Sequence, residues 1–278
     1  MRIKKHKNKN EYLLTEQNFW VRNFTKNSVP YVDINKTIQE KDHFLFLKNE
    51  YNNSRAKYPW IDSSNVHHKK IVIISDGLNF ESKHKILETL SPDVTIIGVN
   101  NTLAKWSNKR NMNYYVVNNP YRQCLNYLTG SKNHPKCIAS NRTNYEFLQA
   151  YKGIKNRYYP VNEESYNSMD YREIRYQIDD NRNVVCAALC LAYKFGAEKI
   201  VLFCCDDAFE DKREGAECFN KVWFYPHDRI PHNLIDNYCY WIKKTEKTRV
   251  LNCSSGLEYN NAQYITEDKM KEFFDGDL

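Results

Sequence analysis

The sequence lacks several features that would assign it to a class of proteins at once. No stretch approaches the roughly 20 consecutive apolar residues that a membrane-spanning helix requires. The charged N-terminus is not followed by an apolar segment, so we expect no secretory signal and a cytoplasmic location. No two cysteines are spaced as CxxC, which argues against a zinc site or a redox motif. Neither GxGxxG nor a Walker loop occurs, so the common phosphate-binding motifs are missing.

The composition is that of a folded globular protein. The 278 residues are 41% hydrophobic and 14% aromatic, enough to bury a full core. The formal net charge of +7 suits anionic substrates such as nucleotides but is too small to predict nucleic-acid binding. Several of the nine cysteines lie inside apolar runs, so we expect reduced, buried thiols.

The composition and the hydrophobic pattern of the chain change near residue 68. Residues 1–67 are polar and rich in aromatics, and they predict a helical extension whose short helices pack onto a domain formed by residues 68–278. From Lys70 onward short apolar strands alternate with helical segments, which predicts an α/β fold with a Rossmann-like, mostly parallel sheet flanked by helices. The expected strands are 71–75, 94–99, 114–117, 136–139, 199–205 and 249–251. The expected helices are 82–90, 102–108, 121–128, 144–151, 181–195 and 232–244.

Small, polar or acidic residues follow each of the six expected strands. In a parallel α/β sheet the carboxyl ends of the strands share one edge, and ligands bind there. Such residues are also ordinary turn formers, so their convergence on one edge carries more weight than any single position. We therefore predict a nucleotide-binding pocket at this edge. Its candidate residues are Ser75, Asp76, Gly77, Asn100, Asn119, Ser140, Asn141, Ser254 and Ser255.

The sequence Asp179-Asp180-Asn181-Arg182 precedes ten uninterrupted apolar or aromatic residues, 184–193. A helix so apolar must be buried against the sheet, which places its start near the sheet edge. One interpretation is structural, with Asp180 as the helix cap. The other is functional: Arg182 and free backbone amides hold a phosphate while Asp179 helps to bind Mg²⁺. A second aspartate beside an arginine exceeds what a cap needs and favours the functional interpretation.

Asp206 and Asp207 end an apolar strand and form the second acidic candidate. Unpaired carboxylates are costly to bury, so both must reach solvent, a partner or a metal ion. We predict catalytic roles for both, with Asp206 and Asp179 as magnesium ligands.

The Pro-rich segment WFYPHDRIPHNL contributes the candidate general bases, His227 and His232. Histidine titrates near neutral pH and serves often as a proton acceptor, although most loop histidines are not catalytic. We assign His227 as the catalytic candidate, and the neighbouring Arg229 is a candidate phosphate clamp.

Four segments carry a family resemblance: IVIISDGL, PDVTIIGVNNTL, the run from Asp179 through AALCLAYKFGAEKIVLFCCDDAF, and the closing NCSSG. They are similar to the MptE-like (DUF115) group, which contains archaeal 6-hydroxymethyl-7,8-dihydropterin pyrophosphokinases and motility-accessory glycosylation proteins. The resemblance implies a Rossmann-like domain over residues 70 to about 270. Where the pterin enzymes carry Asp-Gly-Asp-Arg, this chain keeps Asp179 and Arg182, and only Gly77 matches the first loop.

A second resemblance is to bacterial sialyltransferases that bind a CMP-sugar. That family places Asn after the second strand, Asn-Pro after the third and Ser-Asn after the fourth. Asn100, Asn119-Pro120 and Ser140-Asn141 match these positions in order. The resemblance implies that these residues hold the donor, and the family's catalytic histidine corresponds loosely to His227.

Three functions follow as expectations. The first is Mg²⁺-dependent pyrophosphoryl transfer from ATP to a hydroxymethylpterin-like alcohol, with catalysis mainly by positioning and electrostatics. The alternative is a glycosyltransferase with a nucleotide-activated sugar, in which metal need not be required. The third is a non-catalytic nucleotide-binding protein. In each case the partners are a nucleotide and a small molecule rather than nucleic acid, and a homo-oligomer is left open.

Overall fold

The structure is a computed structural model, and its description covers eight stretches of the chain. These are residues 40–63, 65–160, 176–180, 183–206, 217–219, 222–224, 229–256 and 258–276.

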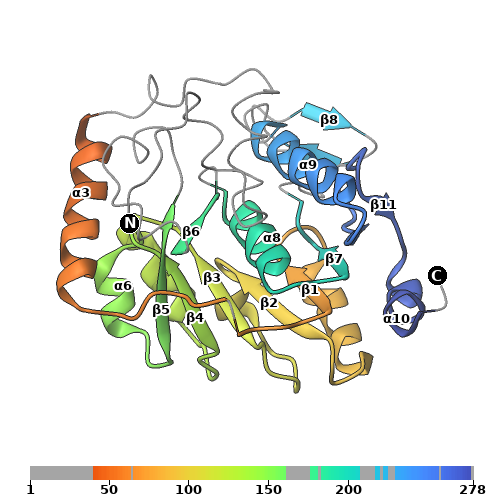
Figure 1. Ribbon diagram of the computed structural model, residues 1–278, viewed down its shortest axis with the longest axis horizontal. Helices are drawn as coiled ribbons and strands as arrows, with labels where there is room; N and C mark the ends of the chain where they lie inside the picture. Colours follow the sequence, from red (N-terminus) through yellow and green to blue (C-terminus); the bar gives the residue numbers. More distant parts are fainter. Residues whose placement is uncertain are drawn as a thin grey trace, which may run out of the picture.

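The centre of the fold is a nine-stranded sheet in which every strand pair is parallel. This confirms the Rossmann-like α/β fold that the sequence predicts. The strands lie in the order β11-β10-β7-β1-β2-β3-β4-β5-β6 (Figure 1). Their bounds are β1 Lys70–Ile74, β2 Thr95–Val99, β3 Tyr114–Val117, β4 Lys136–Ser140, β5 Lys155–Pro160, β6 Gln177–Ile178, β7 Lys199–Phe203, β10 Arg249–Cys253 and β11 Gln263–Tyr264. A separate antiparallel pair is formed by β8 Glu217–Phe219 and β9 Val222–Phe224.

The order of the strands reverses between β1 and β7. The chain lays down β1 to β6 in one direction, crosses back through α8 (Val184–Lys194), and then places β7 against β1. In open α/β sheets such a reversal is the usual place for a ligand, beside the carboxyl ends of the strands. The loops that follow β1 and β7 are therefore the first place to look for a site.

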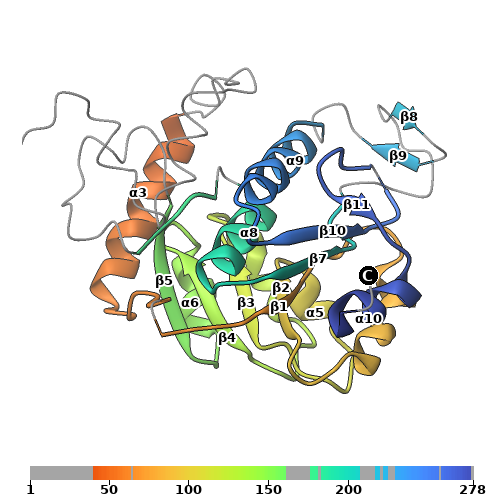
Figure 2. The same ribbon diagram turned by 45° about the vertical axis from the view of Figure 1, so that its right-hand side comes forward.

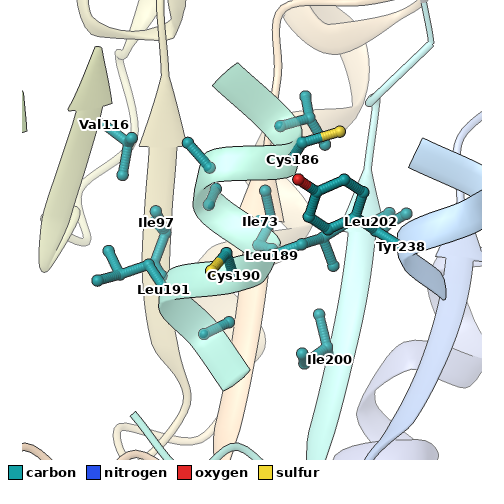
Figure 3. Packing of buried hydrophobic residues seen from close by; sticks show 14 of the residues in the cluster. Ile73, Ile97, Val116, Cys186, Leu189, Cys190, Leu191, Ile200, Leu202 and Tyr238 are labelled. Carbon is teal, nitrogen blue, oxygen red and sulfur yellow. The ribbon is translucent and has the colours of Figure 1, made fainter. Parts of the chain in front are cut away.

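Helices cover both faces of the sheet, so the central strands are buried on both sides. On one face α8 packs on the strands that carry Ile73, Ile97 and Leu202 (Figure 3), and α9 (Arg229–Lys244) packs on α8 and β10. α8 is apolar all round because it lies between the sheet and α9. The opposite face carries α4 (Phe80–Lys83), α5 (Thr102–Lys105), α6 (Tyr145–Ala150) and α10 (Glu267–Asp275).

The short connections differ from the helices expected from sequence. Residues 82–90 divide into the end of α4 and a 3₁₀-helix, His84–Thr89, and residues 121–128 hold only a 3₁₀-helix, Arg122–Leu128. α5 ends at Lys105 because Trp106 turns to an extended backbone. Each of these connections spans few residues between adjacent strands, so the chain has no room for a long α-helix.

Three strands of the sheet escaped the sequence analysis, namely β5, β6 and β11. They lie toward the two edges of the sheet and carry Lys, Asn, Gln and Tyr rather than aliphatic runs. The expected strand 199–205 ends earlier, at Phe203, because Cys204 adopts a left-handed backbone with φ 51°. A residue with a Cβ in that conformation cannot continue a strand.

The helix α3 (Glu40–Arg55) lies at the β5 edge of the sheet, beside α6 (Figures 1 and 2). It lies within residues 1–67, for which the sequence predicts helices that pack onto the domain. The chain after α3 joins the sheet itself, because the backbone amide of Ile61 donates to Arg157 O and that of Arg157 donates to Pro59 O. Within the described stretches no helix is long and apolar enough to span a bilayer.

All eight cysteines whose side chains are described are buried and unpaired, as the sequence predicts. Burial raises the pKa of each of their thiols, for example that of Cys124 to about 12. These thiols are therefore protonated at neutral pH and serve as small apolar core residues.

Candidate functional site

The loops after β1, β7 and β10 are tied together by the buried carboxylate of Asp206. Its Oδ1 accepts a hydrogen bond of 2.8 Å from the Leu78 amide, and its Oδ2 accepts one of 2.9 Å from the Gly256 amide. Burial raises the pKa of the Asp206 carboxyl, although the backbone hydrogen bonds and Lys83 act in the opposite direction. Asp206 occupies the amides that a phosphate would otherwise accept from in this turn. It is thus a buried carboxyl group at the strand reversal, bonded to the backbone of two neighbouring loops.

Gly77 is pressed against the same carboxylate. A Cβ at this position would lie 2.5 Å from Asp206 Oδ1 and 2.5 Å from the carbonyl oxygens of Asp206 and Cys204. The Gly77 amide also donates to Cys204 O over 3.0 Å. Glycine is needed here for close packing between two loops. The predicted role in nucleotide binding stays a prediction, and the described contacts of Gly77 are with the protein itself.

The two candidate serines after β10 take part in the same set of ties. Ser254 Oγ accepts a hydrogen bond from the Cys205 amide, and Ser255 Oγ accepts one from Lys83 Nζ over 2.6 Å. Lys83 also forms an ion pair with Glu267 at the start of α10. Together with Asp206, these bonds hold the β1, β7 and β10 loops as one unit.

The loops after β1 and β2 form a more open polar network around Asp76. Asp76 Oδ2 accepts a 3.0 Å hydrogen bond from Asn101 Nδ2 and lies 3.5 Å from Lys105 Nζ. The Lys105 side chain keeps 34% of its surface exposed and lies 3.8 Å from Glu81 Oε1. Exposed ion pairs of this length stabilise a fold by less than about 1 kcal/mol. Lys105 can therefore exchange Asp76 for a ligand at small cost.

Asn100, directly after β2, has two energetically unfavourable features. Its backbone is left-handed, with φ 46°, a conformation that asparagine adopts more readily than most residues with a Cβ but less readily than glycine. Its Oδ1 atom is buried and has no hydrogen-bond partner in the described protein. An unpartnered buried acceptor costs about 1–3 kcal/mol. Such strain is typical of functional sites, where the missing partner is supplied by a ligand.

Asn119, after β3, is held by the protein on both sides of its amide. Its Oδ1 accepts from the Tyr121 amide over 2.9 Å, and its Nδ2 donates to the Tyr127 hydroxyl over 2.9 Å. Burial raises the pKa of Tyr127, as does the nearby Asp76, although the bond from Asn119 lowers it. Tyr127 is thus a protonated hydroxyl at neutral pH. Its electrostatic interaction with Asp76 places the Tyr127 hydroxyl in the neighbourhood of the Asp76 network.

Ser140 and Asn141, at the end of β4, are buried and bonded into the neighbouring backbone. Ser140 Oγ accepts from the Arg142 amide over 3.2 Å. Asn141 Oδ1 lies 3.4 Å from Arg157 NH1. The structure therefore places these candidates beneath the carboxyl edge, where they shape the loop after β4.

Asp179 and Asp180 are both buried after β6, at the start of the segment that leads to α8. Asp180 Oδ2 accepts a 2.9 Å hydrogen bond from the Tyr158 hydroxyl, and the carbonyl of Asp179 accepts one from Tyr238. The cap of α8 is Asn183, whose Oδ1 accepts from the amides of Val185 and Cys186. The structural interpretation of Asp180 as the cap is therefore wrong, because the helix starts later than the sequence suggests.

Three catalytic candidates, Arg182, Asp207 and His227, lie outside the described residues and stay predictions. His232 is described, and its Nε2 lies 2.9 Å from the carbonyl of Glu258 while its ring stacks on Tyr259. It fastens α9 to the segment after β10. Across the described residues no group of three or more His, Cys, Asp or Glu side chains is arranged to hold a metal ion. Each carboxylate oxygen of Asp206 accepts a hydrogen bond from a backbone amide. A magnesium site at Asp179 and Asp206 stays a prediction.

The structure adds residues that the sequence analysis missed. Lys105 pairs with Asp76, Tyr127 accepts a hydrogen bond from Asn119, and Asn49 and Asn53 of α3 bond to the loops after β3 and β4. Lysine, tyrosine and asparagine are abundant throughout this chain, so their type alone carried no signal. Only the pairing of strands brings their segments together.

Comparison with known proteins identifies the fold but no family. No family model matches the sequence, and no curated protein matches it. Among solved structures, the chain is similar to the MAf glycosyltransferase from Magnetospirillum magneticum AMB-1, with a TM-score of 0.64 and 17% identity. That match covers 82% of this chain but 38% of the MAf chain, so this chain spans less than two fifths of that protein's length. The likeness supports the motility-accessory side of the predicted resemblance as far as the fold is concerned.

A weaker similarity is to the sialyltransferase CstII from Campylobacter jejuni, in complex with cytidine-5'-monophosphate. The TM-score is 0.36 and the identity 12%, over 71% of this chain and 88% of CstII. Likeness at this level carries no conclusion about the present chain.

Proposed function

We propose that this protein is a glycosyltransferase that binds a nucleotide-activated sugar at the carboxyl edge of β1 to β4. The MAf-like fold supports this function over pyrophosphoryl transfer, which no finding supports. The arrangement of the edge supports it as well. Asp206 occupies amides of the loops after β1 and β10, whereas the connections after β2 and β3 carry Asn100 with its positive φ, the partly exposed Lys105 and the Tyr127 hydroxyl.

In the proposed reaction an acceptor hydroxyl attacks the anomeric carbon of the donor sugar. A new carbon–oxygen bond forms, the bond from that carbon to the donor phosphate breaks, and its electron pair leaves with the nucleotide. The acceptor's proton passes to a base, for which His227 stays the candidate. Lys105 and the Tyr127 hydroxyl would neutralise and hydrogen-bond the leaving phosphate, which is electrostatic stabilisation of the departing charge. Asn100 would hold the nucleotide through its amide.

Asn100 carries the proposal, because among the described residues it alone combines a positive φ with a buried side-chain oxygen that has no hydrogen-bond partner. Replacing Asn100 with glycine separates its effect on stability from its effect on nucleotide binding. Glycine adopts positive φ without penalty and removes the unpartnered oxygen, so Asn100→Gly is expected to keep or raise the melting temperature. The same change removes the amide and is expected to weaken nucleotide binding about tenfold.

The measurement is a thermal-shift and calorimetric screen of CMP, UDP, GDP and ATP on the wild type and on Asn100→Gly. The proposal expects a sugar-donor nucleotide to bind the wild type and to bind the variant more weakly. Lys105→Met, which keeps the length of the side chain, should also weaken binding of that nucleotide. Equal affinity in all three proteins contradicts the proposed site.

The same screen separates the three functions that the sequence left open. A pyrophosphokinase converts ATP to AMP with a hydroxymethylpterin and stops when Mg²⁺ is chelated. A glycosyltransferase of the proposed kind releases a nucleotide from its sugar donor, and repeating the assay with EDTA tests whether Mg²⁺ takes part. A binding protein gives nucleotide-dependent melting shifts but no turnover with any donor.

A further inference from the structure

Two buried asparagines of α3 donate hydrogen bonds to the loops of the carboxyl edge. Asn49 Nδ2 donates to Pro120 O over 2.9 Å and to Arg142 O over 3.2 Å. Asn53 Nδ2 donates to Asn141 O over 2.9 Å and to Thr143 O over 2.8 Å. The acceptors are backbone carbonyls of the segments that follow β3 and β4. Both asparagine side chains thus bridge α3 and the site loops.

The residues of α3 that contact the loops after β3 and β4 lie on one face of the helix. Asn49 and Asn53 are four residues apart and therefore lie one above the other on the helix. Glu50, between them, pairs with Arg142 Nε over 2.7 Å. The carbonyl of Asn53 accepts a bond of 3.0 Å from Arg157 NH1, which also lies 3.4 Å from Asn141 Oδ1. The opposite face of the helix exposes Leu47 and Tyr51.

Simple packing of a helix does not need this arrangement. An apolar side chain at either position would bury surface without desolvating an amide, whereas Asn53 leaves its Oδ1 buried and unpartnered. The asparagines contribute directional hydrogen bonds instead. Each holds two backbone carbonyls in place and thereby fixes the path of the loop backbone. These loops carry Asn119 and Asn141, and the Asn144 amide bonds to Asn119 O across them.

We propose that α3 is a positioning element of the donor site. Its pair of asparagines holds the β3 and β4 loops so that Asn119 and Tyr127 face the donor beside Asn100. This inference rests on the proposed function for the identity of the ligand but not for the fixing of the loops. The edge is then held in two independent parts: α3 fixes the loops after β3 and β4, and Asp206 fixes those after β1, β7 and β10.

The test compares Asn49→Ala and Asn53→Ala with Asn52→Ala, on the full chain. Asn52 lies on the same helix and its side chain makes no hydrogen bond to the residues that the structure describes, so its variant controls for altered helix propensity. Gly276→Ala, strained at φ 105° after α10, controls for loss of global stability. Affinity for the nucleotide that binds the wild type is measured by calorimetry, and stability by thermal melting.

We expect Asn49→Ala and Asn53→Ala to weaken nucleotide binding about tenfold, while Asn52→Ala and Gly276→Ala bind as the wild type does. Rescue of affinity by Asn53→Gln is not expected, because the longer side chain cannot meet the same two carbonyls. A fall in melting temperature with unchanged nucleotide affinity overturns the positioning role.

Hydrogen exchange without ligand keeps the two proposals separate. Asn53→Ala should increase exchange at the amides of Thr143 and Asn144 by about tenfold or more and leave those of Leu78 and Gly256 unchanged. If no nucleotide binds the wild type but this pattern appears, the proposed function fails and the fixing of the loops stands. Unchanged exchange at Thr143 and Asn144 overturns the inference about α3.

Discussion

At the scale of single residues, strain gathers at the edge of the sheet where the strands end. Of the five non-glycine residues with positive φ in the described stretches, Asn79, Asn100 and Cys204 follow β1, β2 and β7. Positive φ costs a residue with a Cβ, so a cluster of such residues needs a reason. At Cys204 the reason is structural, because its carbonyl meets Gly77. At Asn100 the side-chain Oδ1 has no hydrogen-bond partner among the described residues, which is why we propose the binding role there.

Gly77 allows a direct test of the packing at the strand reversal. Gly77→Ala places a methyl group 2.5 Å from three oxygen atoms, two of them backbone carbonyls, so one loop must move. We expect the free energy of unfolding to fall by about 2–3 kcal/mol. Gly130→Ala is the control, because its Cβ meets no atom within 4 Å and only its φ of 77° is unfavourable. Urea denaturation of both variants is the measurement, and equal losses would contradict the close packing.

At the scale of secondary structure, the existence of α8 could be predicted from the sequence, but the residue at which it begins could not. Nine consecutive residues of α8 are buried, which follows from an apolar run placed between the sheet and α9. The start of the helix depends on a competition among Asp179, Asp180 and Asn183 for its amides. Asn183 caps the helix, whereas Asp180 accepts a hydrogen bond from Tyr158 and the carbonyl of Asp179 accepts one from Tyr238. A sequence motif cannot resolve that competition.

The cap of α8 is testable by two substitutions at one position. Asn183→Ala removes the acceptor for the Val185 and Cys186 amides and should lower stability by about 1 kcal/mol. Asn183→Asp keeps an acceptor at the positive end of the helix dipole and should retain most of the stability that the cap contributes. Thermal melting of both variants decides the matter. A loss of the same size from Asn183→Asp would show that the amide, and not the cap, stabilises this turn.

At the scale of the whole molecule, burial of histidines couples stability to pH. Burial lowers the pKa of His68, His134 and His232, so the unfolded chain binds protons more readily than the folded one. The stability that these neutral rings contribute is complete above pH 6.5. It is lost as the pH falls from 6.5 toward the lowered values.

We therefore expect the free energy of unfolding to decrease between pH 7.5 and 5.5. His232→Phe keeps the ring that stacks on Tyr259 at 4.4 Å but removes the titration, so this variant should show a shallower decrease than the wild type. Denaturation curves at several pH values provide the measurement. Parallel pH profiles for the two proteins would mean that His232 titrates alike in the folded and unfolded states.

Much of the fold could be predicted because it depends on local pattern. The aliphatic runs of β1, β2 and β7 and the apolar length of α8 indicate central strands and a buried helix on any background. β5, β6 and β11 were missed because strands at or next to the edge of a sheet need little apolar surface. Among the candidate residues, Asn100 and Asp76 lie in the open network, while Asp206 turns inward to bond two amides.

The sequence by itself determined the parallel sheet, its polar carboxyl edge and the burial of α8, because hydrophobic periodicity and strand-end chemistry act over a few neighbouring residues. Only the tertiary structure decided which polar side chains form hydrogen bonds within the protein and which, such as Asn100, keep an atom without a partner among the described residues. That division depends on contacts between segments about 50 to 130 residues apart, such as Leu78 with Asp206 and Asn53 with Asn141. Hydrogen bonds are short-ranged and directional, so such pairs form only after the strands have been placed side by side.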